Sequence, residues 1–85
     1  MTIVTDRKEI EQQVRDKFSR MTNRDWNKED ADRLFSDGMG VDSLYLLEMF
    51  SMVESSFGVM IPMERLQEMQ SINKIVDIIV EYQRA

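Results

Sequence analysis

The hydrophobic pattern of the N-terminal part of the chain predicts an amphipathic helix. Apolar residues recur there every three or four positions with charged residues between them, which is the spacing of one helix face. These apolar positions are Ile10, Val14, Phe18 and Met21. Asp6 is a suitable N-cap and is followed by Glu9, as in a capping box. We therefore expect a helix over about residues 6–21.

A second helix is predicted between Asp42 and Gly58. Asp42 is a good N-cap, and Gly58 suits the left-handed position that ends many helices. The helical spacing between them predicts a core stripe of Leu44, Leu47, Phe50, Val53 and Phe57.

Residues 22–41, before this helix, show no regular spacing of apolar residues. We expect a short turn of helix near 28–34 and a buried anchor at Trp26, Leu34 or Phe35.

The C-terminal part predicts one short and one long helix. Val59 to Ile61 form a brief extended run, Pro62 stops any preceding helix, and 64–69 suit a short third helix. Ser71 can cap the last helix, whose apolar positions are Ile72, Ile75, Val76, Ile79 and Tyr82. The expected fold is all-α, a four-helix bundle of three longer helices and one short third helix.

Length and composition narrow the function. The chain has 85 residues, and we expect one domain over 1–85. It contains no Cys and no His, which removes disulfides, thiolate nucleophiles and imidazole bases, so we expect no enzyme and no metal site. No apolar run is long enough for a membrane span or a signal-peptide core, and the expected compartment is the cytoplasm.

The negative charge is concentrated in the middle of the chain. The formal net charge is -5, which argues against nucleic-acid binding, and both ends of the chain are neutral. Between Asp37 and Glu68 a single basic residue, Arg65, faces six acids: Asp37, Asp42, Glu48, Glu54, Glu64 and Glu68. This segment would steer a basic partner, although such carboxylates can also simply solvate a helix surface.

Ser43 is the candidate for chemistry. It lies just inside the predicted second helix, where free backbone N–H groups and the helix dipole would tolerate an attached phosphate ester. Nothing nearby in the sequence would activate its hydroxyl, so another protein would have to do so. The alternative is that Asp42 and Ser43 are ordinary helix-start residues.

The residues around Ser43 resemble the attachment motif of carrier proteins. The sequence FSDGMGVDSL over residues 35–44 is similar to an apolar residue followed by D-x-G-x-D-S-L, with matches at Gly40, Asp42, Ser43 and Leu44. The resemblance to the acyl carrier protein family covers most of the chain. It continues through Leu47, Glu48, Phe50, Val53, Glu54, Phe57, Gly58, Ile61 and Pro62.

This resemblance implies a free-standing, monomeric carrier with no catalysis of its own. A phosphopantetheinyl transferase would move the 4'-phosphopantetheine arm of coenzyme A onto Ser43, between Asp42 and Leu44, with magnesium assistance. The terminal thiol of the arm would then carry acyl intermediates as thioesters. Other partners would be acyl-loading, synthase or acyltransferase enzymes with basic docking patches. The expected docking residues are Asp37, Tyr45, Glu48, Met52, Glu54 and Ser55, although Tyr45 and Met52 could instead pack on the core.

Several positions depart from the family pattern. Gly38 and Met39 replace a common Asp and Leu, and Asp37 can supply the displaced carboxylate. Tyr45 replaces a residue that is commonly acidic in fatty-acid carriers, and Met63 replaces a polar cap. We therefore expect a dedicated pathway of fatty-acid or polyketide type. The five methionines from Met49 to Met69 are expected to fill the core rather than to form an acyl pocket.

Three alternatives remain at the level of the sequence. The cargo could be an amino acid or aryl acid, as in peptidyl and aryl carriers, although their common G-G-H/D-S motif is absent. The chain could be an unmodified acidic helical adaptor in which Ser43 has no chemical role. Ser43 could also be a regulatory phosphoserine.

Overall fold

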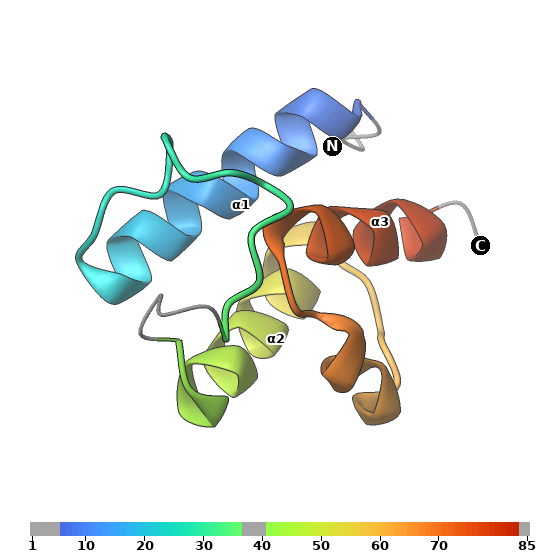
Figure 1. Cartoon of the computed structure of the whole chain (residues 1–85). Helices are drawn as coiled ribbons and strands as arrows, with labels where there is room; N and C mark the ends of the chain where they lie inside the picture. Colours follow the sequence, from blue (N-terminus) through green and yellow to red (C-terminus); the bar gives the residue numbers. More distant parts are fainter. Residues whose placement is uncertain (1–5, 37–40, 84–85) are drawn as a thin grey trace.

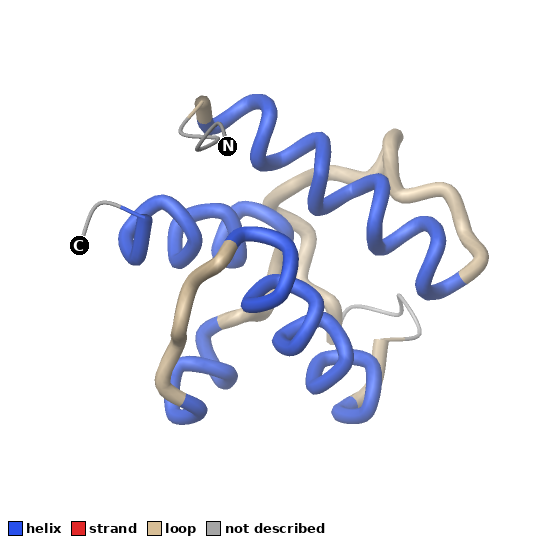
Figure 2. The backbone as a smooth tube through the Cα atoms, turned by 180° about the vertical axis from the view of Figure 1, so that it is seen from behind, coloured by secondary structure: helices blue, strands red, loops and turns tan. Residues whose placement is uncertain are grey.

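The computed structural model describes residues 6–36 and 41–83, and within these ranges it is all-helical. The described residues form three α-helices, α1 (Arg7–Thr22), α2 (Ser43–Phe57) and α3 (Ile72–Gln83), and a short 3-10 helix, η1 (Met63–Glu68), between α2 and α3. The predicted fold class is therefore confirmed, with the short third helix in 3-10 form. Figure 1 and Figure 2 show α1 and α3 side by side, with α2 and η1 below them.

The predicted caps set the ends of the helices. The carboxylate of Asp6 accepts a hydrogen bond from the backbone N–H of Lys8 at 2.9 Å, and Asn23 ends α1 in the left-handed conformation. Gly58 ends α2 with φ of 64°, a left-handed conformation that glycine adopts easily because it has no Cβ. At the start of α3, the Ser71 hydroxyl accepts from the N–H of Lys74 at 3.2 Å. Capping residues in the sequence therefore located these boundaries to within one or two residues.

The core contains one stripe from each α-helix, two residues from each of the segments before and after α2, and one residue from the segment before α3. The fully or nearly buried apolar side chains are Ile10, Val14, Phe18, Trp26, Phe35, Met49, Phe50, Val53, Val59, Ile61, Met69, Ile72, Ile75, Val76, Ile78 and Ile79. Most of the predicted stripes of α1 and α3 are buried, with Met21 and Tyr82 half-buried and packed on the edge of the core.

The predicted core face of α2 was partly wrong. Leu44 is 64% exposed and Leu47 is 43% exposed, whereas Met49 joins Phe50 and Val53 in the core. The reason lies in the run of apolar residues from 44 to 47, which fits two helix faces equally well at the start of the helix. Packing selects the face that contains Leu46, which is half-buried against the core.

The segment between α1 and α2 contains turns where a short helix was predicted. Residues 28–34 form no helix, so that prediction was wrong. Of the three candidate anchors, Leu34 is 48% exposed. Trp26 and Phe35 are the buried anchors. Their rings and that of Phe18 in α1 contact one another, with centroid distances of 5.6 to 5.9 Å, and two of the three pairs are edge to face. This aromatic cluster replaces the helix as the reason why the segment is ordered.

A buried arginine ties the same segment to α1. Arg15 is only 8% exposed, and its Nη1 donates to the carbonyl oxygens of Trp26 and Glu29, both at 2.7 Å. Its Nε also donates to Glu11 at 3.1 Å. One guanidinium thus donates to two backbone carbonyl oxygens of a segment that forms no helix.

The other side of the segment is bonded to the start of α3. The N–H of Phe35 donates to the carbonyl oxygen of Gln70 at 2.8 Å, and the N–H of Asn73 donates to that of Ala31 at 2.9 Å. The side-chain amide of Asn73 also donates to Asp32. The segment therefore bridges α1 and α3 and carries the chain to the start of α2.

The short helix η1 is held mainly by one polar residue. It has no fully buried side chain of its own, and Leu66 is half-buried. The Arg65 guanidinium donates to Glu68 within η1 and to Glu81 and Tyr82 of α3. These contacts fasten η1 to the C-terminal end of α3.

The helices in the described ranges are short or amphipathic. None of them is long and apolar enough to cross a membrane.

Removal of the Arg15 side chain is expected to destabilise the fold. Arg15→Ala should lower the free energy of unfolding by about 3 kcal/mol, because two buried carbonyl oxygens lose a charged donor. The free energy of unfolding of Arg15→Lys should lie between those of the wild type and Arg15→Ala, because an ammonium group cannot reproduce the planar set of guanidinium donors. Urea unfolding followed by Trp26 fluorescence measures the difference. The exposed Arg20→Ala is the control, with a change within about 0.5 kcal/mol; equal effects of the two alanine variants would contradict this role.

Candidate functional site

Ser43 lies at the first position of α2, with an exposed side chain. The preceding residue, Asp42, is the N-cap, and its carboxylate accepts a hydrogen bond from the N–H of Tyr45 at 3.0 Å. The Asp42 carboxylate is thus bonded to the backbone of the first helical turn, while the Ser43 side chain is exposed. Any group attached to Ser43 starts beside the N–H groups of the first helical turn.

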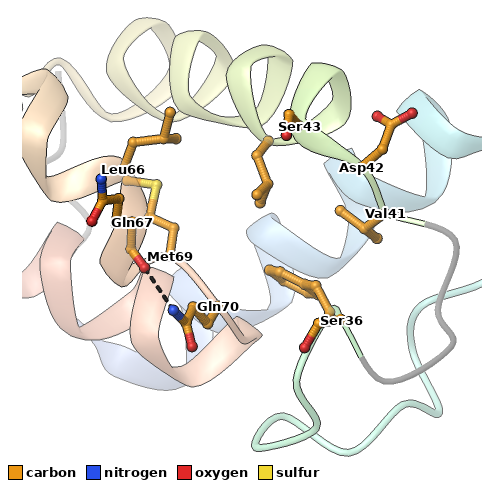
Figure 3. A pocket seen from close by; sticks show the side chains of 10 residues that line it. Ser36, Val41, Asp42, Ser43, Leu66, Gln67, Met69 and Gln70 are labelled. Carbon is orange, nitrogen blue, oxygen red and sulfur yellow. Dashed lines mark hydrogen bonds between the residues drawn. The ribbon is translucent and has the colours of Figure 1, made fainter.

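A pocket of about 530 Å³ opens beside Ser43. Its walls come from α2, from η1 and the residues after it, and from the end of the segment before α2 (Figure 3). The apolar lining residues are Phe35, Val41, Leu46, Leu66 and Met69, and the polar ones are Ser36, Asp42, Ser43, Gln67 and Gln70. The apolar residues are buried or half-buried and the polar ones are exposed. The pocket therefore has an apolar floor and a polar rim, and Ser43 is part of the rim.

The polar groups that line the pocket are hydroxyls, one carboxylate and two amides. Histidine and cysteine are absent from the sequence, and the described residues contain no cluster of three or more acidic side chains that could hold a metal ion. An external base is therefore needed to remove the proton of Ser43. The arrangement suits covalent attachment of a group that another protein delivers.

Some of the predicted docking residues are exposed and others are half-buried. Glu48 and Ser55 are exposed on α2, and Tyr45 is half-buried. Met52 is half-buried and packs on the core, as the alternative interpretation held. Glu54 is half-buried, and its carboxylate accepts a hydrogen bond from the N–H of Ile61 at 3.1 Å, so it also secures the segment after α2.

Several acids of the middle segment have partners within the chain. Glu68 is paired with Arg65, and Asp42 and Glu54 accept backbone hydrogen bonds. Glu48 and Glu64 are exposed. Asp37, which was predicted to supply a motif carboxylate and to face partners, lies outside the described residues, as do Gly38, Met39 and Gly40. Of the two acids in α2, Glu48 is therefore the exposed one.

The methionines mostly do not form the pocket. Met49 and Met69 are buried, Met52 is half-buried, and Met60 and Met63 are exposed. Of these, Met69 lines the pocket. The rest of the wall opposite Ser43 comes from Leu66, Gln67 and Gln70, which the sequence did not single out. No local signal marked them, because Leu66 and Gln67 reach the pocket through the packing of η1 against α2, and Gln70 follows η1 and bonds to Phe35.

Comparison with known proteins gives consistent matches over most of the chain. Residues 12–79 match the model of the family described as phosphopantetheine attachment site. The chain is 30% identical over 80 residues to an acyl carrier protein of Rubrobacter xylanophilus, covering 94% of this chain and 99% of the relative.

Two solved structures share the fold at lower sequence identity. A crystal structure of an acyl carrier protein from Thermotoga maritima superposes with a TM-score of 0.81 at 19% identity, covering 92% of this chain and 91% of that one. A solution structure of an apo doublet acyl carrier protein from prodigiosin biosynthesis gives a TM-score of 0.75 at 22% identity. That match covers 87% of this chain and 36% of the doublet.

Loss of the Asp42 cap is expected to weaken the start of α2. Asp42→Ala should lower the free energy of unfolding by about 1 kcal/mol, because the N–H of Tyr45 loses its acceptor. Asp42→Asn keeps an acceptor oxygen and should stay close to the wild type. Urea denaturation of the three proteins measures the effect. If Asp42→Ala and Asp42→Asn lower the free energy of unfolding equally, the loss comes from the removal of the charge rather than of the capping hydrogen bond.

Proposed function

This chain belongs to the acyl carrier protein family, and from that premise we propose that Ser43 carries its covalent 4'-phosphopantetheine. The family consists of carriers and not of catalysts. The observation that supports Ser43 is its position: an exposed hydroxyl at the first residue of α2, on the rim of the apolar-floored pocket. Asp42 on one side is occupied by capping, and Leu44 on the other is exposed.

The attachment reaction would be carried out by a separate phosphopantetheinyl transferase. A bond forms between Ser43 Oγ and the phosphorus that carries the pantetheine, and the pyrophosphate bond of coenzyme A breaks. The nucleotide leaves as adenosine 3',5'-bisphosphate, and the serine proton passes to a base of the transferase or to water. The contribution of this chain is to hold Ser43 outward on a capped helix, where the N–H groups of the first turn stabilise the phosphodiester.

The cargo would be an acyl group held as a thioester on the terminal thiol of the arm. The apolar floor of Phe35, Val41, Leu46, Leu66 and Met69 suits a hydrocarbon chain better than an amino acid with its charged amine. The match to an acyl carrier protein over nearly its whole length favours acyl cargo over peptidyl or aryl cargo. Tyr45 and Met63 favour a dedicated biosynthetic pathway, of fatty-acid or polyketide type.

Partner enzymes would dock over the start of α2. Glu48 is the exposed acid on this helix, with Ser55 further along it and the half-buried Tyr45 beside it. A partner that reaches Ser43 must also cover the exposed Leu44 and Leu47. Transferase, loading, synthase and acyltransferase enzymes with a basic patch beside an apolar depression fit this surface. Because residues from all helices share one core, 1–85 would act as one domain. We propose that it works as a monomer in the cytoplasm.

The first test is intact-protein mass after incubation with coenzyme A, Mg²⁺ and a broad-specificity phosphopantetheinyl transferase. The wild type should gain the mass of one phosphopantetheine arm, and Ser43→Ala should gain none, because the variant lacks the accepting oxygen. Circular dichroism of both proteins shows whether they are folded. A gain on Ser43→Ala, or no gain on folded wild type with several transferases, would exclude Ser43 as the attachment residue.

The second test concerns the docking surface. Glu48→Lys should lower kcat/KM for the transferase about tenfold at low salt, because a basic patch would meet a like charge. The loss should shrink as salt is added, since screening weakens the repulsion. Glu9→Lys, an exposed charge reversal of the same kind on α1, is the matched control and should stay within about twofold. Equal losses in the two variants would indicate an effect of net charge rather than of docking at Glu48.

A further inference from the structure

Met60 is the most exposed large apolar side chain in the part of the chain that the structure describes. It is 88% exposed, and Met63, close by in the sequence, is 59% exposed. These two residues line neither the core nor the pocket beside Ser43. Met49 and Met69, by contrast, are at most 1% exposed. The fold therefore places the same kind of side chain in two opposite environments.

The backbone fixes the outward direction of Met60. Residues 59–62 form a non-helical connection from α2 to η1, which runs along the edge of the molecule in Figure 1 and Figure 2. Val59 and Ile61 are buried, and the residue between them points the opposite way, as successive side chains do in an extended chain. The N–H of Ile61 donates to Glu54 at 3.1 Å and holds the connection against α2. Met60 therefore cannot turn inward unless its two neighbours leave the core.

Met63 is kept in solvent by the start of η1. It is the first residue of that helix and follows Pro62. The N–H of Arg65 donates to the carbonyl oxygen of Pro62 at 2.9 Å, and the Arg65 guanidinium donates to Glu81 of α3. The turn that carries Met63 is therefore attached to the rest of the fold while the Met63 side chain is exposed.

The thioether sulfur of an exposed methionine reacts with peroxides, whereas a leucine in its place would not. With hydrogen peroxide one oxygen atom is transferred: the S–O bond forms as the O–O bond breaks, and the second oxygen leaves as water. The resulting sulfoxide is polar, so it disrupts a packed core but removes no packing at an exposed position. The chain contains no Cys, whose thiolate would compete for the oxidant.

We propose that Met60 and Met63 form a reversible oxidation site for hydrogen peroxide, which turns an apolar part of the surface polar and leaves the fold intact. In the reverse step two thiols are oxidised to a disulfide, the S–O bond breaks and the oxygen leaves as water, a reaction that methionine sulfoxide reductases catalyse. Met60 suits such an enzyme, because a side chain on a non-helical connection can enter an active site without the unfolding of a helix. The site is independent of the attachment chemistry at Ser43.

The first measurement is the rate of oxygen uptake at each methionine of the folded full chain before the arm is attached. The protein is treated with dilute hydrogen peroxide and digested at intervals, and mass spectrometry gives the sulfoxide fraction of each methionine. Met60 and Met63 should be oxidised at least about tenfold faster than Met49 and Met69, because buried sulfur is reached only when the fold opens. In concentrated urea the four rates should agree within about twofold, since the unfolded chain shelters none of them.

A double leucine variant tests whether these two residues change the surface. Met60→Leu combined with Met63→Leu keeps apolar side chains of similar size and removes both thioethers. Peroxide should shorten the retention of the folded wild type on an apolar resin, and the double variant should lose most of that shift. Met49→Leu, a change of the same kind in the core, is the matched control and should keep the wild-type shift.

The fold and the reversal are measured on the oxidised wild type. Its urea midpoint should match that of the untreated protein, since neither sulfoxide lies in the core. Methionine sulfoxide reductases for both sulfoxide epimers, with dithiothreitol as the thiol, should remove the oxygen from Met60 and Met63 of the folded chain.

Four results would overturn the proposal. Equal oxidation rates at the exposed and the buried methionines of the folded chain would mean that the fold selects no site. A retention shift that the double variant keeps in full would mean that other residues change the surface. A lower urea midpoint after oxidation would mean that the modification damages the fold. Sulfoxides that both reductases leave in place would mean that it is not reversible.

Discussion

The buried guanidinium of Arg15 is the contact on which the rest of the structure depends. It donates to the carbonyl oxygens of Trp26 and Glu29 and so holds a long segment without helix against α1. With that segment in place, the Trp26 ring packs edge to face on Phe18, and Phe35 completes the cluster. A charged group at the edge of a core is stable only when its donors are satisfied, and here backbone acceptors satisfy them.

The position of this segment determines the shape of the functional site. Phe35 belongs to the aromatic cluster and also lines the pocket beside Ser43. Its N–H bonds to the carbonyl oxygen of Gln70, so the same residue ties the pocket floor to the wall formed after η1. The pocket is thus bounded on one side by a capped helix and on the other by a 3-10 helix that depends on Arg65 for its attachment to α3.

The acidic residues of the middle segment have two roles. Glu54 and Glu68, which the sequence placed with the acidic docking segment, form bonds within the fold, to the N–H of Ile61 and to Arg65. Glu48 remains exposed near Ser43. Exposed apolar side chains at Leu44 and Leu47 share this end of α2. Docking of a partner at this surface would use fewer charges than the net charge of -5 suggests. Apolar contact would be the second contribution to binding.

The sequence by itself determined the four helical elements, the caps at Asp6, Asp42, Gly58 and Ser71, the family and the candidate serine, because each of these rests on neighbours in the chain. Asp42 caps the helix that it precedes, and Gly58 ends it, through backbone geometry that is local. Only the tertiary structure decided which face of α2 is buried, since the apolar run from 44 to 47 fits two phases. It also decided that Arg15 is interior and that Gln70 reaches the pocket. These outcomes depend on which distant segments pack together, and no local period contains that information.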